Sequence, residues 1–174
     1  MTISEQQQLG RAKNAILTFL EHRLYIPKVF LDTEWDGKRL DVLAIDRDGS
    51  GDVHAILLFA RRYDEVGELQ RGYQGETIAA LVDELLSVPA HWRYIAAVES
   101  DQLHRAAFAI SDSTAERTFS EDGIGRIGFL AVDAPVDGES KVKIEVRPER
   151  FRAKVAKLAD EYLAQHTADW EIRA

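Results

Sequence analysis

Cysteine is absent from this chain of 174 residues, and its absence excludes several classes of site. Without thiols there are no disulfides, no thiolate nucleophiles, and no zinc or iron–sulfur centres held by cysteine. The five histidines are scattered along the chain, with no HExxH motif and no close pair. A metal site would therefore use carboxylates, which favour hard ions such as magnesium or manganese.

Long hydrophobic runs are missing as well. No apolar run approaches the ~20 residues that span a bilayer, and the opening MTISEQQQLGRAK lacks the basic-then-apolar order of a secretion signal. We therefore expect a cytoplasmic protein with no membrane segment. Hydrophobic residues make up 45% and charged residues 30% of the chain, which is typical of a globular protein. The length predicts a single domain over residues 1–174 with a full core.

Positive charge is in short supply, because the formal net charge is −8. This balance argues against a surface devoted to non-specific nucleic-acid binding, which depends on lysine and arginine. One segment departs from the trend, FARRYDEVGELQRGYQ, with Arg61, Arg62 and Arg71. These three arginines are the candidate nucleic-acid-binding residues, and the alternative interpretation of the segment is an exposed turn after a strand.

The spacing of apolar residues predicts the elements of the first half of the chain. Residues 4–25 carry apolar positions every three or four residues, which indicates a helix with one buried stripe. Residues 28–35 follow as a strand that ends at an Asp-Gly turn. Residues 40–46 and 53–61 are two further strands, joined by a glycine-rich turn. Short turns between three strands predict an antiparallel meander.

The strand around Asp41 is apolar on both faces, which is typical of a central strand covered on each side. Alternation predicts that Asp41, Leu43 and Ile45 share one face. It places the residues between them on the other face, namely Leu40, Val42 and Ala44.

The next elements predict a change of strand direction. Residues 75–87 have the apolar spacing of a helix, and Pro89 prevents its continuation. Residues 92–100 follow as a buried strand. Because this strand is reached through a helix, we expect a crossover connection and a mixed sheet.

The remaining third contains a predicted hairpin and a final helix. A short helix is expected from residue 100 to 108. Residues 124–133 and 141–149 alternate like the two strands of a hairpin, and a last helix is expected over 149–166. His54 and His91 stand next to strand starts and are expected to be exposed or hydrogen-bonded rather than metal ligands.

Residues 4–98 resemble the PD-(D/E)XK, or restriction-endonuclease-like, superfamily in element order and in the acid that opens the second strand. The resemblance implies an α/β fold with a mixed sheet flanked by helices. In that family the first acid and a (D/E)xK triplet hold a divalent cation, and the lysine positions or activates water against a phosphodiester. Asp41 in RLDVLAI fits the first acid, and Phe59-Ala60-Arg61 in LLFARR lies where the triplet should be.

The triplet departs from the family pattern at both functional positions. Phe59 cannot ligate a metal, and Arg61 keeps a positive charge but does not easily give up a proton. Two interpretations follow: the site is degenerate, or the second acid has moved elsewhere. Glu76 at the start of the second helix is the best candidate for a moved acid, and Glu21 and Glu34 are the others.

The resemblance therefore implies Asp41, Arg61 and Glu76 as catalytic candidates, with Asp41 as the metal ligand. It implies no cofactor if the site is degenerate and Mg²⁺ if the chain is active. With Phe59 in place of an acid, we expect Asp41 and Arg61 to contact each other.

Two functions remain open at this point. The first is a divergent nuclease-like pseudoenzyme without efficient cleavage that binds DNA weakly. The second is a protein-interaction or regulatory module on the same fold, with a protein partner or a second copy of the chain, which the net charge favours. A basic groove around Asp41 and Arg61 would support the first function, and an acidic or apolar face the second.

Overall fold

A computed structural model of the chain describes residues 3–59, 74–98, 119–120 and 123–166. These residues form an α/β fold with a six-stranded mixed sheet, a two-stranded sheet and three helices. In chain order the elements are α1 (Ile3–His22), β1 (Lys28–Trp35), β2 (Lys38–Ile45), β3 (Val53–Leu58), α3 (Gln74–Leu86), β4 (Trp92–Val98), β5 (Phe119–Ser120), β6 (Gly123–Ile124), β7 (Gly128–Asp133), β8 (Lys141–Val146) and α5 (Ala156–Gln165).

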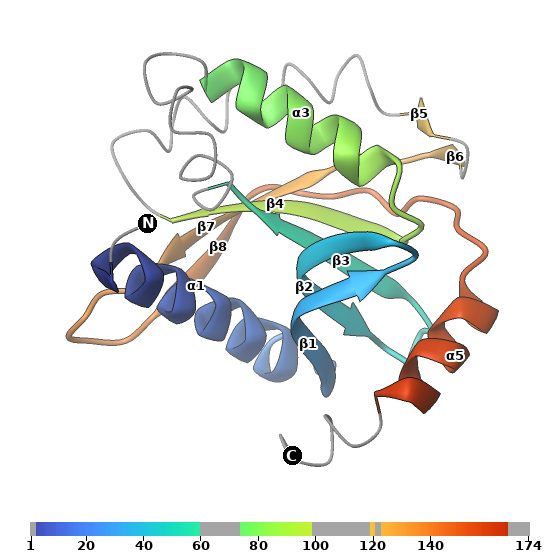
Figure 1. Cartoon of the computed structure of the whole chain (residues 1–174), viewed down its shortest axis with the longest axis horizontal. Helices are drawn as coiled ribbons and strands as arrows, with labels where there is room; N and C mark the ends of the chain where they lie inside the picture. Colours follow the sequence, from blue (N-terminus) through green and yellow to red (C-terminus); the bar gives the residue numbers. More distant parts are fainter. Residues whose placement is uncertain (1–2, 60–73, 99–118, 121–122, 167–174) are drawn as a thin grey trace.

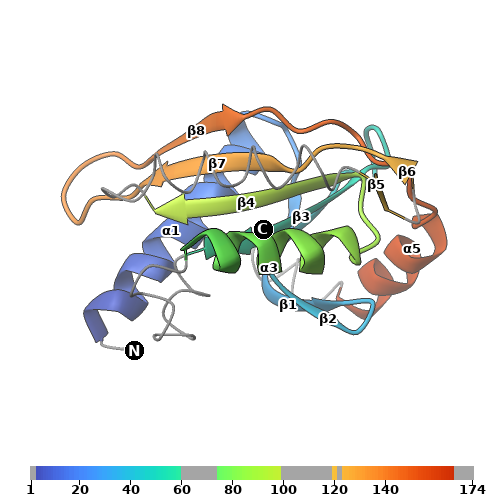
Figure 2. The same ribbon diagram turned by 90° about the horizontal axis from the view of Figure 1, so that it is seen from above.

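The large sheet is mixed, as the sequence predicts. Its strand order is β1-β2-β3-β4-β7-β8, and Figure 2 shows β3, β4, β7 and β8 side by side. The first three strands form the predicted antiparallel meander, and β4 joins β3 in parallel through the crossover that contains α3. The predicted hairpin of β7 and β8 is antiparallel.

Helices cover both faces of this sheet (Figure 1). On one face α1 buries a stripe of apolar residues against the strands, consisting of Ala12, Ala15, Ile16, Phe19 and Leu20. On the other face α3 and α5 form a second cluster with the strands, to which they contribute Leu81, Val82, Leu85, Ala159 and Tyr162. The strands are apolar on both faces because both faces are covered.

The turn between β1 and β2 forms where Asp36 and Gly37 predict it. Trp35 pairs with Lys38, so two residues make the turn, and their φ angles are 51° and 75°. Positive φ at both central positions is the type I′ geometry that matches the twist of a hairpin.

The alternation predicted for β2 fails at Leu40. Leu40 packs in the same cluster as Leu43 and Ile45, on the face of α3 and α5, rather than with Val42 on the face of α1. The facing strand explains the change, because Asp32 has a φ of 49° and this left-handed backbone interrupts the alternation of β1 and β2 together.

Several predicted boundaries are also wrong. The strand predicted over residues 124–133 begins only at Gly128, since Gly123 and Ile124 form β6 of the small sheet, and β8 ends at Val146 rather than at residue 149. The third strand ends at Leu58 rather than at residue 61, and Phe59 is already helical. The last helix begins at Ala156 rather than at residue 149. The residues before it are held by other segments, since the Phe151 amide donates to the His91 carbonyl and Glu149 bridges to Arg126.

The helix predicted over residues 100–108 lies outside the described residues. Within the described ranges, no helix is long and apolar enough to cross a membrane.

Candidate functional site

Asp41 is buried at the point where β2 separates from β3. Its side chain is 3% exposed, and its Oδ2 atom accepts a hydrogen bond from the Leu58 backbone N–H at 2.7 Å. The last register pair of these strands is Val42 with Ile56, so the carboxylate binds the amide two residues beyond it. A side-chain oxygen thus satisfies a buried amide where the ladder between the strands ends.

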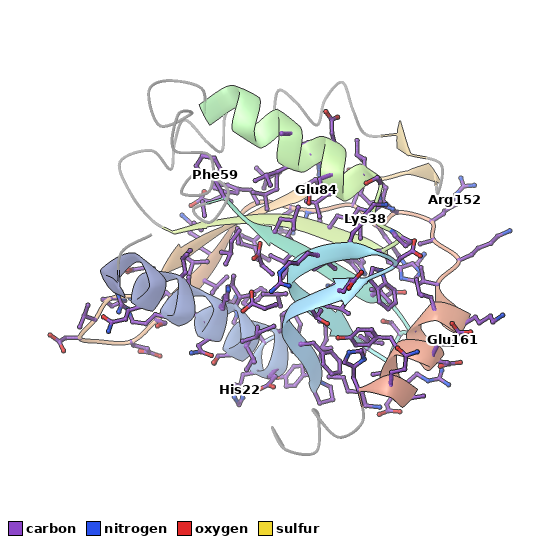
Figure 3. The ribbon with its side chains drawn as sticks, in the orientation of Figure 1. His22, Lys38, Phe59, Glu84, Arg152 and Glu161 are labelled. Atoms are coloured by element: carbon purple, nitrogen blue, oxygen red, sulfur yellow. The ribbon has the colours of Figure 1, made fainter. Side chains whose placement is uncertain are left out.

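Phe59, where the resemblance places the second acid, is a buried core residue. It follows directly after Leu58, is 4% exposed, and belongs to the core cluster on the face of α3 and α5. Figure 3 shows it at the end of β3. The position at which the resemblance places the second acid is therefore occupied by a core residue.

The other candidate acids have different surroundings. Glu34 is exposed on β1, where it pairs in register with Arg39 near the hairpin turn. Glu21 is partly buried on α1. Glu76 belongs to the first turn of α3, and its side chain lies outside the described part. The predicted contact between Asp41 and Arg61 stays a prediction, because the three candidate arginines, Arg61, Arg62 and Arg71, lie outside the described residues.

The residues described around Asp41 do not fit a magnesium ion. In proteins Mg²⁺ takes an octahedral set of oxygens, usually one or two carboxylates with several waters and substrate phosphates. Asp41 is almost fully enclosed and already accepts an amide N–H, and Phe59 offers no ligand atom. In the described segments no group of three or more His, Asp and Glu side chains is placed to hold a metal ion.

A second polar cluster, which sequence patterns do not reveal, lies at the other end of β3. Buried Asp52 accepts hydrogen bonds from Trp92 Nε1 at 2.8 Å and from Nε and Nη2 of Arg150 at 3.0 and 2.8 Å. The hydrogen bond from Arg150 is the main reason why the pKa of Asp52 lies below its usual value. Ninety-eight residues separate Asp52 from Arg150, so no local spacing signals this pair. The cluster ties the starts of β3 and β4 to the segment before α5.

His91 belongs to the same cluster and has the hydrogen-bonded state expected from the sequence. Its Nδ1 atom accepts from the Val53 backbone N–H at 2.9 Å and lies 3.7 Å from Asp52 Oδ1. Burial lowers the pKa of His91, against the raising effect of Asp52. Because Nδ1 is occupied by a backbone donor, this nitrogen is not available as a metal ligand or a general base.

His54 differs from its prediction, which was an exposed or hydrogen-bonded side chain. It is 7% exposed, and in the described structure its buried Nδ1 atom has no hydrogen-bond partner. Its ring lies nearly parallel to those of Trp92 and Tyr94, with centroids at 6.1 and 6.0 Å. Burial lowers the pKa of His54 to about 4, although Asp52 raises it.

No family model, no curated protein and no solved structure matches this chain.

Proposed function

We propose that the chain is a restriction-endonuclease-like domain that has lost efficient phosphodiesterase activity. The element order supports the proposal: a helix, an antiparallel three-stranded meander, a helix, and a strand parallel to the third. Asp41 lies on the second strand of this unit, the strand that carries the first acid in that superfamily.

We infer the loss of activity from one observation, the structural role of the Asp41 carboxylate. A metal-binding carboxylate must face a space open to the ion, its waters and the substrate phosphate. Asp41 instead accepts the Leu58 N–H inside the core, and the next residue along β3, Phe59, is a buried hydrocarbon side chain. The carboxylate has become a structural acceptor at the end of the β2–β3 ladder.

A cleavage assay tests this proposal. Purified protein is incubated with plasmid and with single-stranded DNA in Mg²⁺ and in Mn²⁺, with Asp41→Ala and Glu76→Ala beside the wild type. We expect no cleavage by any of the three proteins, because one enclosed carboxylate cannot hold a catalytic ion. Robust cleavage by the wild type that both substitutions abolish would show that the second acid has moved to α3.

The nucleic-acid role in this proposal is weak, salt-sensitive DNA binding through Arg61, Arg62 and Arg71. This role is tested by comparing the affinity of the wild type for labelled DNA with the affinity of a variant in which all three arginines are replaced by alanine. The net charge of −8 favours the second candidate function, a protein-interaction module on the same fold. An unchanged affinity in the triple variant, with a protein partner or a second copy bound at that surface, would favour this second candidate.

A further inference from the structure

The strand β8 forms one outer edge of the large sheet, because it is last in the order β1-β2-β3-β4-β7-β8. Figure 2 shows β8 along the outside of the sheet, with β7 on its inner side. Among the residues that the structure describes, no strand pairs with the outer side of β8. Such an edge presents backbone N–H and C=O groups that can pair with another strand.

The side chains of β8 alternate between an apolar face and a charged face. Val142 and Ile144 pair in register with β7 residues of the core cluster that contains α1, and Ile144 is still 38% exposed. Lys141, Lys143 and Glu145 therefore lie on the face away from α1. There Lys143 Nζ lies 3.2 Å from Glu145 Oε1.

One hydrogen bond indicates which backbone groups of β8 are turned outward. In an antiparallel pair, every second residue directs its N–H and C=O away from the neighbouring strand. The Val142 carbonyl accepts a hydrogen bond at 3.2 Å from Nη1 of Arg23, which lies directly after α1 and not on β7. We therefore place the backbone groups of Val142 and of Ile144, two residues later, on the outer side. The Val142 carbonyl keeps a second lone pair for another donor.

The order of charges on β8 is self-complementary. Lysines on an edge strand usually discourage pairing, but Glu145 changes this for one partner, a second copy of the same strand. When the second copy lies antiparallel with Lys143 at a twofold axis, Lys141 of each copy is opposite Glu145 of the other. Opposite charges at such positions stabilise a pair of strands.

The same register matches the apolar side chains and the backbone. On the face of α1, Val142 of each copy lies opposite Ile144 of the other, which covers the exposed part of Ile144. These are also the two residues whose backbone groups are turned outward, so they form the hydrogen-bonded pairs of the new ladder.

The shape of β8 favours a closed dimer over a growing fibre. The register with β7 shifts between Phe129 and Leu130, so the regular part of β8 ends at Glu145. A twofold contact uses the same segment of both copies and leaves no β8 edge for a third. Residues 141–145 of each copy make a small interface, so the dimer is expected to be weak and to depend on concentration.

We infer that β8 pairs antiparallel with β8 of a second copy of the chain, with Lys143 at the twofold axis. This surface goes beyond the proposed function, because it contains none of the residues that carry the family resemblance.

Sedimentation velocity of the full chain over a range of concentrations measures this dimer. The test variants are Lys141→Glu, Glu145→Lys and both substitutions together. Each single reversal places like charges opposite each other at two symmetry-related positions, so it should weaken the dimer by at least about tenfold. The combined variant restores opposite charges at both positions and should recover the affinity of the wild type to within about twofold.

The exposed ion pair of α5, Lys157 with Glu161, provides the matched control. Lys157→Glu, Glu161→Lys and their combination make the same changes in charge away from β8. We expect these three variants to dimerise as the wild type does.

A single introduced cysteine tests the register, since the chain has no cysteine of its own. Lys143→Cys places two thiols at the twofold axis, where the Cα atoms of a non-hydrogen-bonded pair are about 4.5 Å apart. This distance lies within the range of a disulfide. Oxidation with copper–phenanthroline should cross-link Lys143→Cys into a dimer much faster than Lys157→Cys.

Several results would overturn the inference. These are a wild type that stays monomeric up to about 1 mM, single reversals without effect, a combined variant as weak as the single reversals, equal cross-linking of the two cysteine variants, or oligomers that grow beyond a dimer. Circular dichroism of each variant confirms that it is folded. A dimer that is lost in the Arg61, Arg62 and Arg71 variant but unchanged in Lys141→Glu would also reject β8. The DNA cleavage assay is independent of all these outcomes, so the proposed function and the dimer can fail separately.

Discussion

Replacement of Arg93 by alanine is expected to lower the free energy of unfolding by about 3 to 5 kcal/mol. For a chain of this size the corresponding fall in melting temperature is about 6 to 20 °C. Arg93 is a fully buried cation on β4, and its guanidinium lies next to the C-terminal end of α3.

The contacts of Arg93 explain this expectation. Its Nε donates to the Ala90 carbonyl at 3.0 Å, and its Nη1 donates to the Leu85 and Leu86 carbonyls at 3.1 and 3.0 Å. The last carbonyls of a helix lack partners within the helix and carry partial negative charge, so a cation stabilises them. The guanidinium carbon also lies 4.0 Å from the centre of the Phe151 ring. Alanine removes all of these contacts and leaves a cavity.

Thermal and denaturant unfolding of Arg93→Ala, Arg93→Lys and Arg152→Ala measure the effect. The lysine variant keeps the charge but loses the planar fork, so its stability should lie between alanine and the wild type. Arg152 is exposed on the segment before α5 (Figure 3), and its removal should change stability by less than about 0.5 kcal/mol. A loss below 1 kcal/mol in Arg93→Ala would show that this cation does not stabilise the end of α3.

Acidification from pH 6.5 to pH 4 is expected to cost the fold about 3 kcal/mol through His54 alone, since a pKa difference of one corresponds to about 1.4 kcal/mol. Burial lowers the pKa of His54 in the folded state from 6.5 to about 4. The unfolded chain therefore takes up the proton first as the pH falls. Stability is fully present above pH 6.5 and decreases through this interval.

Three other titratable groups near His54, namely His91, Asp52 and Asp46, also affect how stability depends on pH. His91 has a pKa lowered by burial and adds to the loss in the same interval. Asp52 has a pKa below 3.8, so the stability that it contributes is lost only at lower pH. Asp46 and Asp52 both raise the pKa of His54 and reduce the effect without reversing it.

The His54→Leu variant separates the contribution of His54 to the pH dependence of stability from the contributions of the other titratable groups. Leucine cannot be protonated and leaves no unpartnered nitrogen in the core, so the variant should match or exceed the wild type at pH 7. Denaturant unfolding at a series of pH values should show a shallower loss in the variant between pH 6.5 and pH 4. Parallel curves for the two proteins would show that His54 is not the group that titrates.

The elements that could be predicted from the sequence are those fixed by local chemistry. The strand over residues 28–35 and the turn at Asp36 and Gly37 follow from alternation and from the φ angles that these turn residues tolerate. The crossover after β3 follows from a helix between two apolar strands.

The features that could not be predicted depend on partners distant in sequence. α5 begins seven residues later than its apolar spacing suggests, because the Phe151 amide is bound to His91. Leu40 changes face because of a left-handed residue on the neighbouring strand. His54 is polar but stands in a strand whose six residues are all buried, so its burial follows from the sheet around it rather than from its own character. For the candidate site, the sequence predicts Asp41 on the second strand but at its opening, whereas β2 begins at Lys38 and Asp41 is its fourth residue. The bond from Asp41 to the Leu58 amide appears only once β2 and β3 are paired.

The stability of Asp41 variants tests most directly the claim that this carboxylate is structural. Asp41→Ala should lose about 1 to 3 kcal/mol in denaturant unfolding, because the buried Leu58 N–H is left without its acceptor. Asp41→Asn keeps a side-chain oxygen for that N–H and should lose less than Asp41→Ala, while Glu34→Ala on the exposed part of β1 should be unchanged. Removal of a working metal-binding carboxylate commonly leaves a protein equally or more stable. An Asp41→Ala variant as stable as the wild type, or more so, would contradict the account.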